Sequence, residues 1–279
     1  MRPPAEASLA GEGEGAHSVG DILRAAADWF WIPRDGDYAA AELHLVRYPA
    51  GLGGGVRGSH VRSALAAPDV LDHAIERTCA WGEKVLTFWT NPSDDPDLED
   101  ELQRRGAELI DTVTVFALRI DDARIEVPPS ATAEVVREIE QVRAIDAINA
   151  PVWDQAPLND PGLAAELREI ERDLEAGAGF RVLGRVDGAP VSTGGCTVVD
   201  GFSRLWGAAT LAHARGQGGY RAVLAERLRF SAELGATTAL VKGRVATSAP
   251  ILTRAGFTRY GEERAYRLSI PRASPARDR

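Results

Sequence analysis

The residues with the clearest chemical potential form a short glycine-rich stretch in the second half of the chain. Residues Arg215–Arg221 read RGQGGYR and lie between a predicted strand and a predicted helix. Glycines allow the backbone to curl so that several N–H groups point inward, and the helix N-terminus adds partial positive charge. The two arginines add ionic contacts suited to phosphate. The stretch therefore predicts a pyrophosphate-binding loop, although it is neither a GK[ST] phosphate loop nor a GxGxxG fingerprint.

Three side chains outside this loop are candidates for acid–base chemistry or for binding an amine. His213 precedes the loop by two residues and is a candidate base, because imidazole is a common general base, with a solvent-exposed or structural histidine as the alternative. Trp153 and Asp154 lie in the segment NAPVWDQAPLND after a predicted helix. A carboxylate there suits holding or deprotonating a cationic amine, and an exposed turn residue is the alternative.

The elements that position these residues are predicted from turn signals and apolar periodicity. Asp187-Gly188, between the apolar runs FRVLGRV and APVSTGGCTVV, predicts a hairpin, and Asp200-Gly201 leads into a third strand, FSRLWGAATL. The glycine-rich loop follows this strand, and a helix is predicted from Arg221. Two more helices, over residues 135–148 and 161–176, are predicted before the hairpin.

The two halves of the chain show the same order of elements, which indicates an internal repeat. Residues 71–82 and 224–235 both have the pattern of an amphipathic helix that ends at a glycine, at an offset of 153. A strand follows each helix, over 85–89 and 237–241. A short helix and a closing strand come next at an offset of 150, which places Gly106 on Gly256 and Phe116 on Tyr266.

The first half lacks the chemistry of the loop. Where the second half has RGQGGYR, residues Arg62–Pro68 read RSALAAP. No glycine opens the backbone there, and Pro68 removes an N–H group. The carboxylates of Asp69 and Asp72 would repel a phosphate. We therefore expect that the first half does not bind an anionic cofactor.

Composition and charge limit the classes of function. The chain has 279 residues and a net charge of −9. Residues 1–125 hold 12 Lys/Arg against 22 Asp/Glu, and residues 203–259 hold nine against two. The local basic segment favours an anionic ligand rather than a nucleic-acid surface. With no long apolar stretch and no signal-peptide core, we expect a cytoplasmic protein with no membrane partner.

Cysteine usage is consistent with a reducing compartment. Only Cys79 and Cys196 are present, far apart in the sequence. They form neither a disulfide framework nor a CxxC pair, and we expect no metal site. Cys196 lies in a predicted strand, where a buried structural residue is the preferred interpretation.

At the loop the sequence resembles the GNAT superfamily of acyl-CoA-dependent N-acyltransferases, whose cofactor loop is written [QR]-x-x-G-x-[GA]. Arg215 and Gly218 match, while Tyr220 replaces the final small residue. The resemblance covers residues 132–268, including SAPILTRAGF, and more weakly residues 21–118. It implies an α+β (mixed α/β) chain of two tandem GNAT-like domains, each a mostly antiparallel central sheet flanked by helices, with an inactive first domain.

The resemblance also implies how an acyl-CoA would bind. In this family a bulge in the strand before the loop parts two strands, and the pantetheine arm lies between them. A backbone N–H of this strand, which we assign to Thr210, would polarise the thioester carbonyl. Ser248 would contact the pantetheine end, with helix capping as the alternative. Leu252 stands where the family often has an acidic tyrosine. The implied cofactor-binding residues are Ala208, Ala209, Thr210, Leu211, Arg215, Gly216, Gln217, Gly218, Gly219, Tyr220, Arg221 and Ser248.

These observations lead to a specific expectation about organisation and function. We expect a disordered segment 1–18, a degenerate GNAT-like domain 19–120, a linker 121–130, a catalytic domain 131–270 and a flexible tail 271–279. The expected activity is direct transfer of an acyl group, most simply acetyl, from acyl-CoA to a small-molecule amine. Thr210, Asp154 and His213 are the candidate catalytic residues, and Trp153 and Asp154 the candidate acceptor-binding residues. One alternative is a thioester donor on an acyl carrier protein, used for transfer or decarboxylation. Another is acyl-CoA binding without catalysis.

Overall fold

The computed structural model describes residues 17–33, 36–50, 53–59, 61–92, 94–244 and 248–270; the expected tail and residues 1–16 lie outside the described residues. Two residues that we expected to be disordered contact the fold, since Ser18 caps the first helix and His17 stacks on Phe202. The first half contains α1 (Val19–Ala27), β1 (Asp37–Ala40), β2 (His44–Arg47), β3 (Val56–Ser59), α2 (Ala67–Ala80), β4 (Val85–Thr90), α3 (Asp97–Arg104), β5 (Glu108–Arg119) and η2 (Ile120–Asp122). The second half contains β6 (Ala131–Val135), α4 (Ile139–Trp153), α5 (Asp160–Glu175), β7 (Gly179–Val186), β8 (Ala189–Val199), β9 (Phe202–Thr210), η3 (Ala212–Ala214), α6 (Gly219–Glu233), β10 (Thr238–Arg244), α7 (Ala249–Arg254) and β11 (Thr258–Ser269).

The described strands form one 11-stranded sheet, in the order β1-β2-β3-β4-β11-β5-β10-β9-β8-β7-β6. Within the described residues all neighbours are antiparallel except β3–β4 and β9–β10. The expected α+β class and mostly antiparallel pairing are therefore confirmed. The sheets of the two halves are continuous with each other rather than separate.

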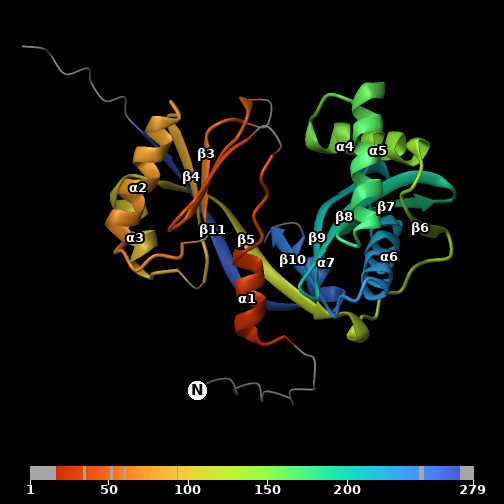
Figure 1. Ribbon diagram of the computed structural model, residues 1–279. Helices are drawn as coiled ribbons and strands as arrows, with labels where there is room; N and C mark the ends of the chain where they lie inside the picture. The colour runs from red at the N-terminus through yellow and green to blue at the C-terminus, as the bar shows by residue number, and fades with distance from the viewer. Residues whose placement is uncertain are drawn as a thin grey trace, which may run out of the picture.

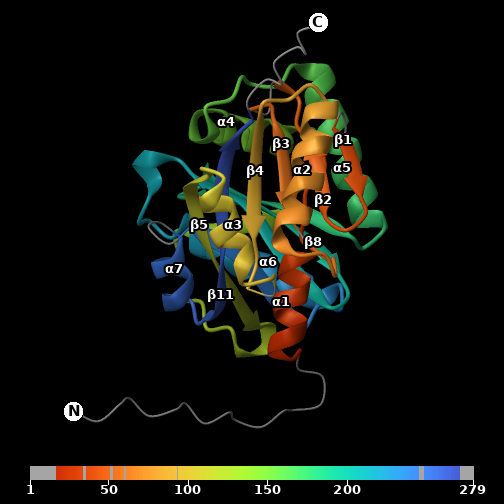
Figure 2. The same ribbon diagram turned by 90° about the vertical axis from the view of Figure 1, so that its left-hand side faces the viewer.

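Helices cover both faces of the second half. Val182 packs in the cluster under α6, and the next residue, Leu183, packs under α4 and α5. Because successive side chains of a strand point to opposite faces, α6 lies on one face and α4 and α5 on the other. In the same way, Ala239 packs in the cluster under α6, and the next residue, Leu240, packs in the cluster under α1. In the first half, α2 and α3 lie against β4, as Figure 2 shows.

The last strands of the two halves are exchanged. β11, from the end of the chain, pairs with β4, and β5, from the end of the first half, pairs with β10. β5 and β11 also pair with each other at the centre of the sheet (Figure 1). Each half therefore has its sheet completed by a strand from the other half.

The register of the central ladder follows the offset expected from the sequence repeat. Phe116 pairs with Arg259, and the pair displaced by 150 residues, Leu109 with Tyr266, is also formed. The register shift after Arg259 likewise has a counterpart next to Tyr266. The ladders β4–β11 and β5–β10 also correspond. Phe88 pairs with Tyr266 in the first ladder, and the residues equivalent to them in the repeat, Val241 and Phe116, pair in the second. The two halves are thus related as a tandem repeat.

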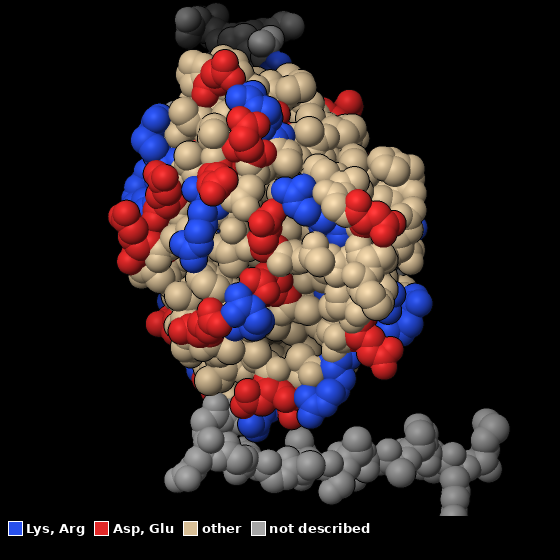
Figure 3. All heavy atoms as spheres, turned by 90° about the vertical axis from the view of Figure 1, so that its right-hand side faces the viewer, with Lys and Arg blue, Asp and Glu red and all other residues tan. Residues whose placement is uncertain are grey.

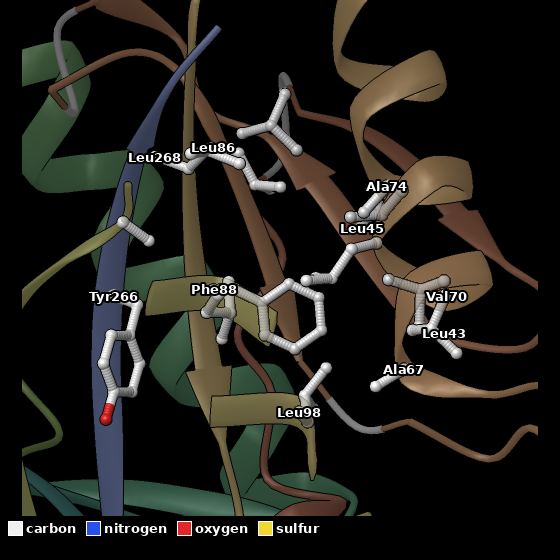
Figure 4. Packing of buried hydrophobic residues seen from close by; sticks show 14 residues of the cluster. Leu43, Leu45, Ala67, Val70, Ala74, Leu86, Phe88, Leu98, Tyr266 and Leu268 are labelled. Carbon is white, nitrogen blue, oxygen red and sulfur yellow. The ribbon is translucent and has the colours of Figure 1, made fainter. Parts of the chain in front are cut away.

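The core of the first half includes side chains from the exchanged strand. Tyr266 and Leu268 of β11 lie beside Phe88 and Leu86 of β4 (Figure 4). Tyr266 is 2% exposed, and its hydroxyl donates to Glu99 of α3 at 2.9 Å. Tyr266 is therefore a core residue of the first half, although it comes from the end of the chain.

The turns were predicted more accurately than the first helix of the second half. Asp187 and Asp200 have φ angles of 49° and 50°, and the glycine that follows each of them also has a positive φ angle. Both predicted turns are therefore present. The helix expected from residue 135 begins at Ile139 and ends at Trp153. Residues 131–135 form β6 instead, because they pair with β7 at the edge of the sheet.

Candidate cofactor-binding site

The parallel strands β9 and β10 part near the middle of the sheet. Their ladder contains three pairs, from Phe202–Thr238 to Arg204–Leu240, after which β9 continues for six further residues without pairing to β10. A bulge lies in this extension, since Thr193 of β8 pairs with Ala209 and Gly195 pairs with Trp206. Gly207, inside the bulge, has φ +61°, which favours glycine. The result is a gap between two strands with unpaired backbone facing it.

The backbone of Thr210 faces this gap. Leu211 N–H donates to Val191 at 3.0 Å, and Thr210 lies opposite Ser192. In an antiparallel ladder, successive residues direct their backbone polar groups alternately toward and away from the neighbouring strand. The Thr210 N–H therefore points away from β8, toward the side from which β10 has diverged. A hydrogen bond of 2.9 Å between the Ser192 and Thr210 hydroxyls holds the strand end in place.

The glycine-rich loop connects this strand to α6 through two left-handed residues. Gly216 has φ +81° and Gly218 has φ +97°. A Cβ atom on Gly218 would lie 2.3 Å from the Pro128 ring, so the expected linker segment packs directly against the loop. Gly219 begins α6, and a Cβ atom on it would lie 3.2 Å from Val191 and 3.3 Å from Ser192 of β8. The loop is thereby held against the strand next to the gap.

The N-terminus of α6 has no side-chain cap. Gly218 is its N-cap, provides no side-chain hydrogen bond, and is followed by no acidic residue in the first turn. The side chains of Arg215 and Arg221 are exposed and form no hydrogen bond or ion pair with another described residue. A 15-residue helix with free N–H groups and two nearby guanidinium groups matches a phosphate-binding site.

The corresponding region of the first half is shorter and differently charged. The β3–β4 ladder ends at Gly58, nine positions before α2 begins at Ala67, whereas fifteen positions separate Arg204 from Gly219. The missing length falls before Arg62 and corresponds to the extension of β9 that carries the bulge in the second half. α2 also has a proline and Asp69 in its first turn. Arg62, at the position equivalent to Arg215, forms an ion pair with Asp28.

The other candidate residues lie on three different elements, and none of their side chains has a described hydrogen bond to β9, to β10 or to another candidate; the Ser248 backbone N–H donates to the Arg244 carbonyl of β10 at 3.1 Å. His213 is exposed in η3, and its carbonyl accepts from Gln217 at 2.9 Å. Asp154 is the left-handed C-cap of α4, with Trp153 44% exposed beside it. α4 packs in the same cluster as Ala209, so its end lies over the face of the sheet that carries this residue. Ser248 precedes α7 without a side-chain cap hydrogen bond, so the capping alternative is not formed.

A buried ion pair lies on β10 where it leaves β9. Lys242 Nζ is 2.8 Å from Glu263 Oε2 of β11, and it also lies 5.7 Å from the centre of the Trp29 ring. Burial raises the pKa of Glu263, and the Lys242 ammonium acts in the opposite direction. The Lys242 side chain is 22% exposed and the Glu263 side chain 3%, so the carboxylate is the more deeply buried partner of the pair.

Three glycines at the site were not singled out from the sequence. Gly194 and Gly195 lie on β8 opposite the bulge, and Gly207 lies within it. A Cβ on Gly195 would come within 2.4 Å of the Trp206 ring. The consecutive glycines in VSTGGCTVV were the available signal, because a glycine pair inside a strand marks a bulge or a close approach. The Cys196 side chain is buried, with the Ser203 hydroxyl 3.0 Å from its sulfur, as expected for a structural thiol.

Several solved structures have this fold over most of their length. A GCN5-related N-acetyltransferase from Kribbella flavida has 22% sequence identity and a TM-score of 0.63, covering 86% of this chain and 91% of that chain. One from Sphaerobacter thermophilus has 17% identity and a TM-score of 0.61, covering 92% and 87%. A tandem GNAT protein from the clavulanic acid biosynthesis pathway has 15% identity and a TM-score of 0.60, covering 94% and 92%. No protein-family model and no curated protein matches the chain.

The chain therefore has the GNAT fold in a tandem arrangement, as the resemblance implied. Among the described residues, no group of three or more His, Cys, Asp and Glu side chains is placed to hold a metal ion. None of the described helices has the length and apolarity needed to cross a membrane.

Proposed function

We propose that the second half of the chain is an acyl-CoA-dependent N-acyltransferase acting on a small-molecule amine. The observation that carries this proposal is the continuity of three features along β9, η3 and α6. They are the strand gap, the glycine-rich loop and the free helix N-terminus. An extended pantetheine arm fits the gap, and a pyrophosphate fits the loop. Because the first half lacks the extension and the loop, we assign one cofactor site to each chain.

The chain's residues have distinct parts in the proposed reaction. Arg215, Arg221 and the loop N–H groups hold the phosphates of the acyl-CoA. The Thr210 N–H donates to the thioester carbonyl, and this hydrogen bond strengthens as the oxygen becomes negative. The amine nitrogen forms a bond to the carbonyl carbon, the carbon–sulfur bond breaks, and CoA leaves as thiolate. The amine proton passes to a base, for which Asp154 and His213 remain our candidates.

Departure of the thiolate requires little help from an acid. The resemblance placed an acidic group at position 252, where this chain has leucine. Leu252 is 1% exposed and packs in the core against Gly243 of β10 and Phe116. A free thiol has a pKa of about 8.5, so the leaving group is stable as an anion near neutral pH. We therefore propose a mechanism without a tyrosine acid at this position.

The proposed acceptor is a small amine, with Trp153 and Asp154 in its binding site and the cytoplasm as its compartment. The side of the molecule in Figure 3 carries acidic and basic side chains interspersed, without a continuous basic surface. This distribution favours a small acceptor over a nucleic acid. It also gives no support on that side to docking of an acidic carrier protein.

Incubation of the purified protein with acetyl-CoA and a panel of amines tests the proposal. Thiol release and the mass of the product report transfer. We expect acetylation of at least one amine, abolished in the Arg215→Ala, Arg221→Ala double variant. Cofactor binding without transfer to any amine would favour a non-catalytic acyl-CoA-binding protein. Transfer only from an acylated carrier protein would favour the carrier-dependent alternative.

A further inference from the structure

Arg227 is a buried cation without an acidic partner among the described residues. It lies on α6, two turns after the glycine-rich loop, and is 1% exposed. Its Nη1 atom donates to the Gly195 carbonyl at 3.3 Å, and its Nε atom has no hydrogen-bond partner. A buried guanidinium group with one long hydrogen bond is costly, because its lost hydration is poorly replaced. The side chain therefore requires an explanation beyond packing.

The guanidinium group lies flat against β8 at the position of the β9 bulge. A Cβ atom on Gly194 would be 3.0 Å from Arg227 Cζ, so a larger residue at this position would push the guanidinium group away from the strand. Gly194 falls at the register shift between the pairs Thr193–Ala209 and Gly195–Trp206. On the opposite face of β8, the Trp206 ring covers Gly195 and is itself covered by Arg181, 3.9 Å from the ring centre. The backbone opposite the bulge is thus clamped from both faces.

Arg227 also approaches the phosphate-binding end of its own helix. Its Cζ atom lies 5.9 Å from the centre of the Tyr220 ring, and Tyr220 belongs to the loop. The group therefore bridges the two parts of the cofactor site, the loop and the strand gap. Its charge adds to that of Arg215, Arg221 and the helix N-terminus, with no acid in the first turn of α6.

We propose that Arg227 is a positioning residue that holds β8 against the bulge of β9 and so sets the gap for the pantetheine arm. This inference rests on the proposed use of acyl-CoA. The proposed role affects the two parts of the ligand, the pantetheine arm and the nucleotide, to different extents. Loss of Arg227 disturbs the gap, which takes the pantetheine arm, more than the loop, which takes the nucleotide.

Calorimetric titration with two probes tests this distinction. The probes are acetyl-CoA and 3′-phosphoadenosine 5′-diphosphate, which lacks the pantetheine arm. We expect Arg227→Met to weaken acetyl-CoA binding by about tenfold or more, and binding of the nucleotide by less than about threefold. Arg221→Met should weaken both ligands in parallel, and Arg229→Met, an exposed change on the same helix, should weaken neither.

The conservative variant Arg227→Lys keeps a charge and a donor for Gly195. We expect it to restore acetyl-CoA affinity to within about threefold of the wild type. If Arg227→Met does not fold, Arg227→Lys and Arg227→Gln carry the comparison, with the larger acetyl-CoA loss expected for Gln. Equal losses for both probes, or no loss, would overturn the role of Arg227 alone. Failure of the wild type to bind acetyl-CoA would overturn the proposed function as well.

Discussion

At the scale of single residues, the partly buried carboxyl group of Asp94 accepts hydrogen bonds from the backbone and side chain of Asn91. Burial raises its pKa to about 6, while hydrogen bonds from Asn91 act in the opposite direction. Glu263 and Glu99 add repulsion that raises it further. Because the folded pKa lies above the unfolded value of 3.8, Asp94 favours the folded state most below about pH 4. This contribution is lost as the pH rises through about 6.

Replacing this carboxyl group by an amide should therefore change the pH dependence of stability. We expect Asp94→Asn to be about 2 kcal/mol more stable than the wild type above pH 7, and equally stable near pH 4. Urea unfolding across this pH range measures the difference. Asp100→Asn, at an exposed position, is the control. A constant difference at all pH values would mean that Asp94 does not titrate as described.

The arginines at equivalent positions of the two halves should differ in their effect on ligand binding. Arg215 has no described side-chain partner, whereas Arg62 is paired with Asp28. We expect Arg215→Ala to weaken acetyl-CoA binding by about 1.5–3 kcal/mol, the usual contribution of a charged hydrogen bond. Arg62→Ala should leave binding almost unchanged. Equal losses, measured by calorimetry, would contradict the assignment of one site to the second half.

At the scale of elements, the loop before α6 depends on close contact with the segment between the halves. Gly218 combines φ +97° with a Pro128 ring that leaves no room for a Cβ. Gly216 also has positive φ, but a Cβ there would meet no atom within 4 Å. A substitution at Gly216 therefore introduces backbone strain alone, whereas a substitution at Gly218 introduces both backbone strain and steric overlap.

A pair of alanine variants makes this separation measurable. We expect Gly216→Ala to cost about 1 kcal/mol of unfolding free energy, from backbone strain alone. Gly218→Ala should cost about 2 kcal/mol more, because Pro128 or the loop must move. It should also weaken acetyl-CoA binding more strongly than Gly216→Ala does. Similar effects of both variants on stability and binding would show that the contact with Pro128 is unimportant.

Local signals in the sequence were sufficient for the loop, the hairpin turns and the repeat. Asp-Gly pairs and helix-ending glycines act through backbone conformation within a few residues, so their outcome does not depend on distant packing. The role of Arg227 was not predictable in this way. It depends on Gly194 and Gly195, which approach α6 only after β8 and β9 have paired.

At the scale of the whole molecule, strand exchange joins the two halves into one sheet. The sequence could not predict this exchange, because β5 and β11 occupy equivalent places in the repeat. Either strand has the length and apolar pattern to pair with β4 or β10. The choice depends on long-range pairing, which local pattern does not specify. The division at residues 121–130 remains our proposal for the boundary between the repeats.

The exchange predicts that a change near the C-terminus destabilises the first half. Tyr266→Ala removes a ring from the core formed with Phe88 and α3. We expect a loss of about 3–4 kcal/mol, with hydrogen exchange accelerated first in β4, α2 and α3. Tyr266→Phe removes only the hydrogen bond to Glu99 and should cost about 1 kcal/mol. Acceleration confined to β9 and α6 would contradict the described pairing.

The number of cofactor sites per chain tests the central claim most directly, because the two halves share a fold but not the loop. Titration of the purified wild-type protein with acetyl-CoA in a calorimeter measures this number. We predict one site per chain, lost in the Arg215→Ala, Arg221→Ala double variant and retained in Arg62→Ala. Two sites per chain, or one site that survives the double variant, would contradict a single cofactor site in the second half.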